Sequence, residues 1–263
     1  MIETAKIFDN IDEIIDRIDN FKIEPIFTEE KNRRLNKNVS LLLDDNKILK
    51  TLSYLIAFSQ NANSEVVERV LKSGKFDNAF QNFDINKVVK LNPCVIADNH
   101  WKSIRGIRQQ AKLFHIVMLA RKMKKNGSFA KILFKTDIPK RIKNKTDVDK
   151  FWVGFNTLLR VLKEKKIPFF QSTTSLLHFL LHIGYDCVKP DLIVMRVAKE
   201  LKIVENETGD RNLRKTVRFI QEYSVKRKVR PSIIDFYFLI YGGQRDARKF
   251  VKPDFKKIND DNE

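Results

Sequence analysis

Hydrophobic residues recur along most of the chain at intervals of three and four, the spacing that places them on one face of an α-helix. The first such segment is Ile7 to Phe21, where Ile and Phe alternate with Asp and Glu. Residues 47–60 are apolar on most sides, which predicts a buried helix. Further stripes are formed by Val66, Val67, Val70 and Leu71, by Phe151, Phe155, Leu158 and Leu162, and by Leu213, Val217 and Ile220. No period of two persists, so we expect an all-α fold of roughly nine to eleven helices.

The segment from Ser103 to Asn126 predicts one long helix. Its apolar face would contain Ile104, Ile107, Ala111, Phe114 and Met118, which recur at three and four residues. Lysines crowd the end of the segment, where they favour the helix dipole, and Gly127 ends it. A second apolar segment, residues 175–184, predicts a buried helix that ends at Gly184.

Polar residues and helix-capping residues set the expected boundaries. Asn63 or Ser64 can cap one helix, and Pro231 with Ser232 starts the last one, where Asp235 completes a capping-box pattern. Residues 22–45 are polar and predict an irregular segment. The length allows one large domain or two lobes that share a core, over residues 1–250, followed by a charged, flexible tail over 251–263.

The charge of the chain indicates a polyanionic partner. Lys and Arg number 51 against 33 Asp and Glu, a net charge of +18. Three basic segments stand out, residues 139–145, 225–230 and 245–252. Nucleic acid is the first candidate partner and an anionic membrane surface the second. The N-terminal segment is acidic and no apolar stretch is long enough for a membrane span, so we expect a soluble intracellular protein.

Candidate metal ligands and nucleophiles are few. Cys94 and Cys187 do not form a CxxC pair, and we expect both to be buried thiols in a reducing compartment. His178 and His182 share a helix face but lack an HExxH motif and a third ligand, so packing between helices is favoured over zinc binding. We expect no metal and no other cofactor. The chain has no P-loop, GxGxxG or GxSxG, which removes support for nucleotide hydrolysis and serine hydrolase chemistry.

The stretch KPDLIVMRV, residues 189–197, places Asp191 directly before an apolar helical segment. An aspartate at that position is typical of a helix N-cap. A carboxylate at the N-terminus of a helix can also face a substrate, and the residues alone leave both interpretations open.

Four stretches together resemble the helix-hairpin-helix DNA glycosylase superfamily over about residues 47 to 245. These stretches are LSYLIAFSQNANSEVVERVL, WKSIRGIRQQAKLFHIVMLARKM, PFFQSTTSLLHFLLHIGYDCVKPDLIVMRVAKEL and IIDFYFLIYGGQ. The Asp-x-x-Val-x-Arg-Val pattern at 191–197 is the sharpest match. The resemblance implies a two-lobed helical DNA repair enzyme that flips a damaged base out of the duplex and hydrolyses its N-glycosidic bond.

The resemblance also implies roles for individual residues. Asp191 would stabilise the oxocarbenium-like sugar and activate water. Gln60 would fill the hole left by the flipped base, or is simply a helix-end residue. Arg196 would be a structural partner or a phosphate contact, and Trp101 would stack on a base or belong to the core. The first candidate substrate is an alkylated purine, with an oxidised or mismatched base as the alternative. We expect a cytoplasmic, nucleoid-associated monomer acting on double-stranded DNA.

The chain departs from the family pattern in its hairpin. Where the family reads Leu-Pro-Gly-x-Gly, this chain has IPFFQ, which keeps Pro168 but has neither glycine. Gln171, Ser172 and Thr173 would then have to supply the DNA contacts. Bifunctional members have a lysine where Thr173 stands, so no Schiff base, and hence no strand cleavage at the abasic site, is expected. The iron–sulfur loop of some members is missing. The alternatives are a non-catalytic DNA-binding protein on the same fold and a basic helical RNA-binding protein.

Overall fold

The computed structural model describes residues 2–37, 44–60, 62–243 and 245–255. Over these residues the chain forms fourteen α-helices, several short 3-10 turns and no strand beyond an isolated bridge between Lys22 and Val251. The all-α prediction is confirmed. The expected number of helices was too low because α5 (Lys75–Ala79), α6 (Ile85–Val88) and α9 (Phe129–Phe134) have only four to six residues, too few to show a periodic stripe.

The chain folds into two compact units. The first unit contains the described residues of 1–39, 139–151 and 173–263, and the second contains those of 40–138 and 152–172. Helix α10 (Lys145–Glu164) contributes its first turns to the first unit and its remainder to the second. Its expected stripe of Phe151, Phe155, Leu158 and Leu162 is fully buried.

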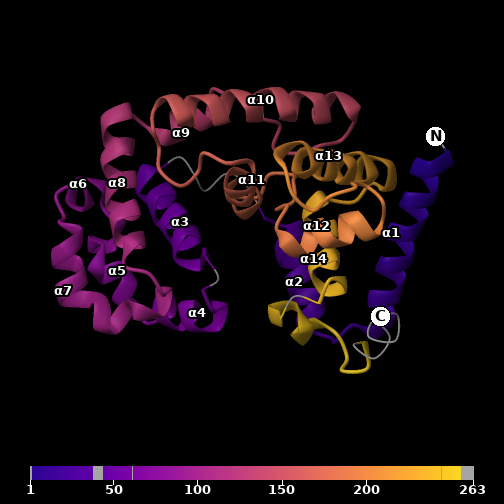
Figure 1. Cartoon of the computed structure of the whole chain (residues 1–263), viewed down its shortest axis with the longest axis horizontal. Coiled ribbons are helices and arrows are strands. Elements are labelled where there is room, and N and C mark those ends of the chain that lie inside the picture. The colour runs from indigo at the N-terminus through magenta and orange to yellow at the C-terminus, as the bar shows by residue number, and fades with distance from the viewer. Residues whose placement is uncertain (1, 38–43, 61, 244, 256–263) are drawn as a thin grey trace. The chain divides into compact units, whose positions relative to one another are not determined.

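Helix α14 (Pro231–Tyr241) is the centre of the first unit. It packs against α1 (Ile2–Phe21), α2 (Ile26–Leu35), α12 (Leu192–Glu200) and α13 (Asp210–Arg227), as Figure 1 shows for its yellow ribbon. Its sequence is apolar on nearly every side, so it is buried on nearly every side. Helix α11 (Thr173–His182) packs on α13 and completes this unit.

Two segments of the first unit correct the sequence interpretation. Residues 26–35, expected to be irregular, form α2, which buries Phe27 and little else. Its contacts to α14 are the Phe27 ring, which packs against Phe236 and Tyr237, and the ion pair between Arg34 and Asp235. The start of the expected flexible tail is ordered: Val251 and Phe255 are buried, and the Phe255 ring packs 5.8 Å from that of Phe21. Residues 256–263 lie outside the described residues.

The second unit is built on α3 (Asp45–Phe58) and α8 (Ala111–Asn126), which run side by side (Figure 1). Helices α4 (Ser64–Lys72) and α7 (Pro93–Ile104) flank this pair. Asn63 caps α4 as expected, its side chain accepting a hydrogen bond from the Val66 amide. Four aromatic rings, those of Tyr54, Phe76, Phe80 and Phe83, pack on one another with centroids 5.1 to 6.0 Å apart.

The single helix expected over residues 103–126 is wrong. The chain ends α7 at Ile104, turns through a 3-10 segment (Arg105–Ile107) and Arg108 at φ +77°, and starts α8 at Ala111. The break changes the buried face. Phe114 and Met118 are 46% and 40% exposed, whereas Leu113, Ile116, Val117, Ala120 and Met123 are buried. Gly127 ends α8 as expected.

The two cysteines differ in their exposure. Cys187 is buried, but Cys94 is exposed, which corrects the expectation that both thiols are buried. Among the described residues, no helix is both long enough and apolar enough to cross a membrane.

Candidate functional site

Asp191 caps α12, as its position before an apolar helix predicts. Its Oδ1 atom accepts hydrogen bonds from the Ile193 amide at 3.1 Å and the Val194 amide at 3.2 Å. Its Oδ2 atom lies 3.3 Å from Lys189 Nζ, and the side chain is 20% exposed. One carboxylate oxygen therefore holds the helix start, while the other faces a lysine.

A buried ion pair anchors the loop that carries Asp191. The Lys189 amide donates a hydrogen bond to Asp235 Oδ1 at 3.0 Å, and Arg34 Nη1 lies 2.9 Å from Asp235 Oδ2. Burial raises the pKa of the Asp235 carboxyl, and the Arg34 charge acts in the opposite direction. The expected capping box at Ser232 and Asp235 is wrong, because Asp235 points to this loop and to α2 and forms no cap for α14. The sequence carries no local signal for this anchor, because Arg34 and Asp235 are 201 residues apart.

A close helix contact also positions Asp191. Gly242 follows α14 and packs against the first turn of α12. A Cβ atom on Gly242 would lie 2.5 Å from the Ile193 side chain and 3.1 Å from that of Val197, so a larger residue would push α12 away. Ile193 is thus held twice, by its amide on Asp191 Oδ1 and by its side chain against Gly242.

The hairpin segment keeps a glycine-like backbone without a glycine. Phe169, at the position of the first family glycine, has φ +74°, in the region that favours glycine. Its ring packs 5.2 Å from Phe170 and 6.4 Å from His115 of α8. We infer that these ring contacts hold the left-handed conformation in place of the missing glycine.

The other expected hairpin contacts have different surroundings. Pro168 is half-buried, and the Gln171 Nε2 atom donates a hydrogen bond to the Ile167 carbonyl at 2.6 Å, which closes the loop on itself. Ser172 is exposed. Thr173 is buried and donates its hydroxyl hydrogen bond to Asp210, so a phosphate contact from this hydroxyl would require that bond to break.

Gln60 lies in the turn after α3, exposed and at φ +57°. A buried lysine holds this turn: Lys112 Nζ donates to the carbonyls of Ala57 at 2.9 Å, Ser59 at 2.8 Å and Ile107 at 2.8 Å. Burial lowers the pKa of Lys112 to about 8, with a smaller contribution from Arg108. Lys112 thereby joins the Gln60 turn to the turn that contains Gly106.

Arg196 and Trp101 have separate surroundings. Arg196 is exposed on α12, and no described residue pairs with it, so the interpretation as a structural partner gains no support. Trp101 is half-buried and lines an open groove of the second unit.

The paired histidines form no metal site. No group of three His, Cys, Asp or Glu side chains in the described ranges could hold a metal ion. His178 is half-buried, and burial lowers its pKa to about 3, with the Lys189 charge contributing. His182 has a larger exposed surface, yet burial also lowers its pKa to about 4, with the charges of Lys37 and Arg33 contributing.

The predicted site residues thus lie in both units. Asp191, Thr173 and Arg196 belong to the first unit, and Gln60, Pro168, Gln171 and Ser172 belong to the second. Within the second unit α8 connects the two predicted segments, because Lys112 holds the Gln60 turn and His115 contacts the hairpin. The sequence did offer one signal for the buried Lys112, because it is a lysine within the apolar segment that forms α8.

Comparisons of the chain with protein-family models, with curated proteins and with solved structures gave no match.

Proposed function

We propose that this chain is a monofunctional DNA glycosylase that hydrolyses the N-glycosidic bond of a damaged base. The observation that carries the proposal is the Asp191 carboxylate, with one oxygen fixed on the α12 amides and the other beside Lys189, in a side chain that is 20% exposed. The net charge of +18 supports a DNA partner. The resemblance at residues 191–197 supports the role of this aspartate.

The chemistry follows from the bond that breaks. As the base departs, positive charge develops on the sugar, and a fixed carboxylate stabilises that charge. The Oδ2 atom of Asp191 is the oxygen available for this contact and for orienting the attacking water. Because Oδ1 accepts two backbone hydrogen bonds, the carboxylate needs little rearrangement before the reaction.

The base must leave the stack before Asp191 can act on its sugar. In this proposal Gln60 enters the space left in the duplex, since its side chain is exposed on a turn that Lys112 holds. Arg196 contacts a phosphate. An alkylated purine is the preferred substrate, because its positive charge already weakens the bond and one carboxylate suffices.

A panel of duplexes with single lesions tests the proposal. The protein is incubated with each duplex, and alkali then cleaves any abasic sites. We expect release of at least one alkylated purine, with strands intact before alkali. Borohydride should trap no adduct, because Thr173 has no amine. Release from no lesion would contradict the proposal, and efficient trapping would contradict the monofunctional mechanism.

Two observations favour a second candidate, a non-catalytic DNA-binding protein. Lys189 Nζ lies 3.3 Å from Asp191 Oδ2, so a sugar cation would have to share this oxygen with a lysine. Phe169 and Gln171 also replace both hairpin glycines. Duplex binding without base release across the panel is the result that this candidate predicts.

A further inference from the structure

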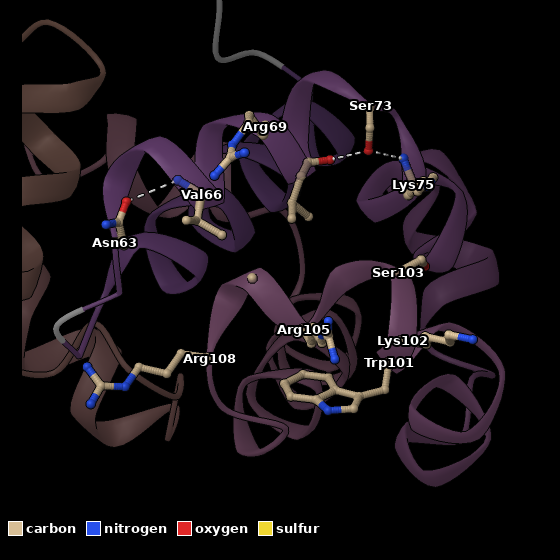
Figure 2. Close-up of a pocket in the computed structure, with 12 residues that line it drawn as sticks. Asn63, Val66, Arg69, Ser73, Lys75, Trp101, Lys102, Ser103, Arg105 and Arg108 are labelled. Atoms are coloured by element: carbon tan, nitrogen blue, oxygen red, sulfur yellow. Dashed lines mark hydrogen bonds between the residues drawn. The ribbon is translucent and has the colours of Figure 1, made fainter.

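An open groove of about 830 Å³ lies in the second unit, between α4 and the end of α7 (Figure 2). Cationic side chains and one indole dominate its lining: Arg69, Lys75, Lys102, Arg105, Arg108 and Trp101. None of the described residues that line it is acidic. The groove therefore concentrates positive charge around an aromatic ring.

Two of these cations, Arg69 and Arg105, have no acidic partner among the described residues. In the first unit, buried carboxylates pair with arginines, as Asp235 does with Arg34 and Asp186 does with Arg230 at 2.8 Å. The sequence contains no Asp or Glu between Asp98 and Asp137. Unpaired cations lining one groove attract an anion and raise its local concentration.

Trp101 gives the groove a stacking surface. Trp101 and Arg105 both line the groove (Figure 2) and are four residues apart in the chain, about one helical turn. An aromatic face next to basic side chains is the combination on which unpaired bases stack while their phosphates pair with the cations.

The groove wall is already formed. Gly106 lies in the turn after α7, and a Cβ on it would be 2.7 Å from the Val70 side chain and 2.8 Å from that of Val66. The turn that carries Arg105 and the helix that carries Arg69 are thus in direct contact. Binding then requires little rearrangement, which favours affinity.

The shape favours a strand over a small molecule. A small-molecule site encloses most of its ligand, whereas this groove is open to solvent along α4 and α7 (Figure 2). We propose that the groove binds an unpaired nucleic-acid strand, with one base stacked on Trp101 and its phosphates against Arg69 and Arg105. This binding goes beyond the proposed base release and does not depend on Asp191.

Tryptophan fluorescence tests the stacking. The chain has two tryptophans, and Trp152 is 7% exposed, with its ring centroid 5.3 Å from that of Phe155. In a Trp152→Phe variant, Trp101 is the only indole. Short oligothymidylate and oligouridylate, which separate DNA from RNA, are titrated alongside an abasic strand and tripolyphosphate. We expect at least one oligonucleotide to quench Trp101, while the abasic strand and tripolyphosphate do not. Equal responses to all four, or no quenching by either oligonucleotide, would overturn the proposal.

Substitutions test the phosphate contacts. Removing two of them in Arg69→Gln/Arg105→Gln should reduce the slope of log K against log salt by about 1.4 for a single strand. Lys163→Gln/Arg211→Gln, at exposed residues outside the groove, makes the same change in net charge and should leave the slope unchanged. Trp101→Ala should weaken binding about fivefold or more, with Trp101→Phe retaining part of the affinity.

Melting curves of all variants show whether each is folded. Equal slopes of log K against log salt for the two double variants would contradict the proposed phosphate contacts of Arg69 and Arg105. The strands contain no lesion. If the oligonucleotides do not quench Trp101 fluorescence, only the proposed strand binding in the groove is contradicted. If no base is released from lesion duplexes, only the proposed glycosylase function is contradicted.

Discussion

At the scale of single residues, Lys112 shows how one buried charge can organise two turns. Its ammonium group is fully buried and donates to the carbonyls of Ala57, Ser59 and Ile107. These carbonyls lie at the end of α3 and at the end of the 3-10 segment, where helical partners are missing. The lysine satisfies them together, and its three protons match the three acceptors.

Replacing this lysine should destabilise the protein. Lys112→Met keeps the length of the side chain but leaves three carbonyls without a donor, and we expect a loss of about 2–3 kcal/mol in unfolding free energy. Lys125→Met, at an exposed position of the same helix, serves as the control and should change stability little. Urea unfolding measures both variants. Equal stability of Lys112→Met and the parent would show that these hydrogen bonds contribute nothing.

Phe169 allows a test of the hairpin backbone. A left-handed conformation costs an L-residue about 1–2 kcal/mol relative to glycine. Phe169→Ala loses the ring but keeps this strain, whereas Phe169→Gly loses both. We therefore expect the glycine variant to be about 1 kcal/mol more stable than the alanine variant. At Gln171, where φ is not positive, the control variant Gln171→Ala should be at least as stable as Gln171→Gly. The reverse order at Phe169, measured by urea unfolding, would refute the left-handed turn.

At the scale of elements, periodicity located helices well where one face is apolar. Helices α1 and α10 follow their stripes, and Asp191 begins α12 as its capping pattern predicts. Periodicity failed at α2, which contacts α14 through one buried ring, that of Phe27, and through Arg34 rather than through an apolar stripe. It also failed at the turn before α8, because Ile104 and Ile107 fit a helical stripe although the chain turns between them and α8. The charged and aromatic groups that fix Asp191 and Phe169 come from distant segments, and sequence spacing cannot pair them.

Helix α11 makes the stability of the first unit dependent on pH. Burial lowers the pKa of His178 to about 3, below its usual value of about 6.5. Between these values the unfolded chain binds a proton that the folded chain does not, so stability falls as pH falls from about 6.5 toward 3. His178→Gln should reduce this slope, with His100→Gln as the control. Chemical unfolding at several pH values measures it, and an unchanged slope in His178→Gln would contradict the assignment.

At the scale of the whole molecule, some basic side chains form ion pairs within the protein and others are exposed to solvent. Arginines of two basic segments pair with acids: Arg141 and Arg230 with Asp186, and Arg227 with Asp9 and Asp12. Lys143, Lys226 and Lys228 remain exposed. If the basic segments bind DNA, the phosphate contacts should therefore come from these exposed lysines and not from the paired arginines.

Salt dependence of duplex binding tests this charge directly. Four phosphate contacts correspond to a slope of log K against log salt of about −3.6, and we expect that value or a steeper one. Lys226→Gln/Lys228→Gln should reduce the slope by about 1.8 if both lysines contact phosphate. Fluorescence anisotropy of a labelled duplex measures it. A flat salt response would remove duplex DNA as the partner.

Asp191 carries the central claim, and Asp191→Asn separates its two roles. Asparagine caps a helix about as well as aspartate, so the unfolding free energy should change by no more than roughly 1 kcal/mol. The negative charge near the sugar is lost, and so is the base for water. DNA binding should survive or tighten slightly, because a negative charge has been removed. Asp84→Asn provides a matched control, because Asp84 caps α6 through the Asn86 amide at 3.0 Å and lies in the second unit.

The most direct measurement is the single-turnover rate of base release by Asp191→Asn, on a preparation whose melting temperature and DNA affinity match those of the parent. For the loss of one electrostatic stabiliser we expect the rate to fall by about 10²–10³, while Asp84→Asn releases base at the parent rate. If folded, DNA-binding Asp191→Asn releases base as fast as the parent, then Asp191 only caps α12 and the account is wrong.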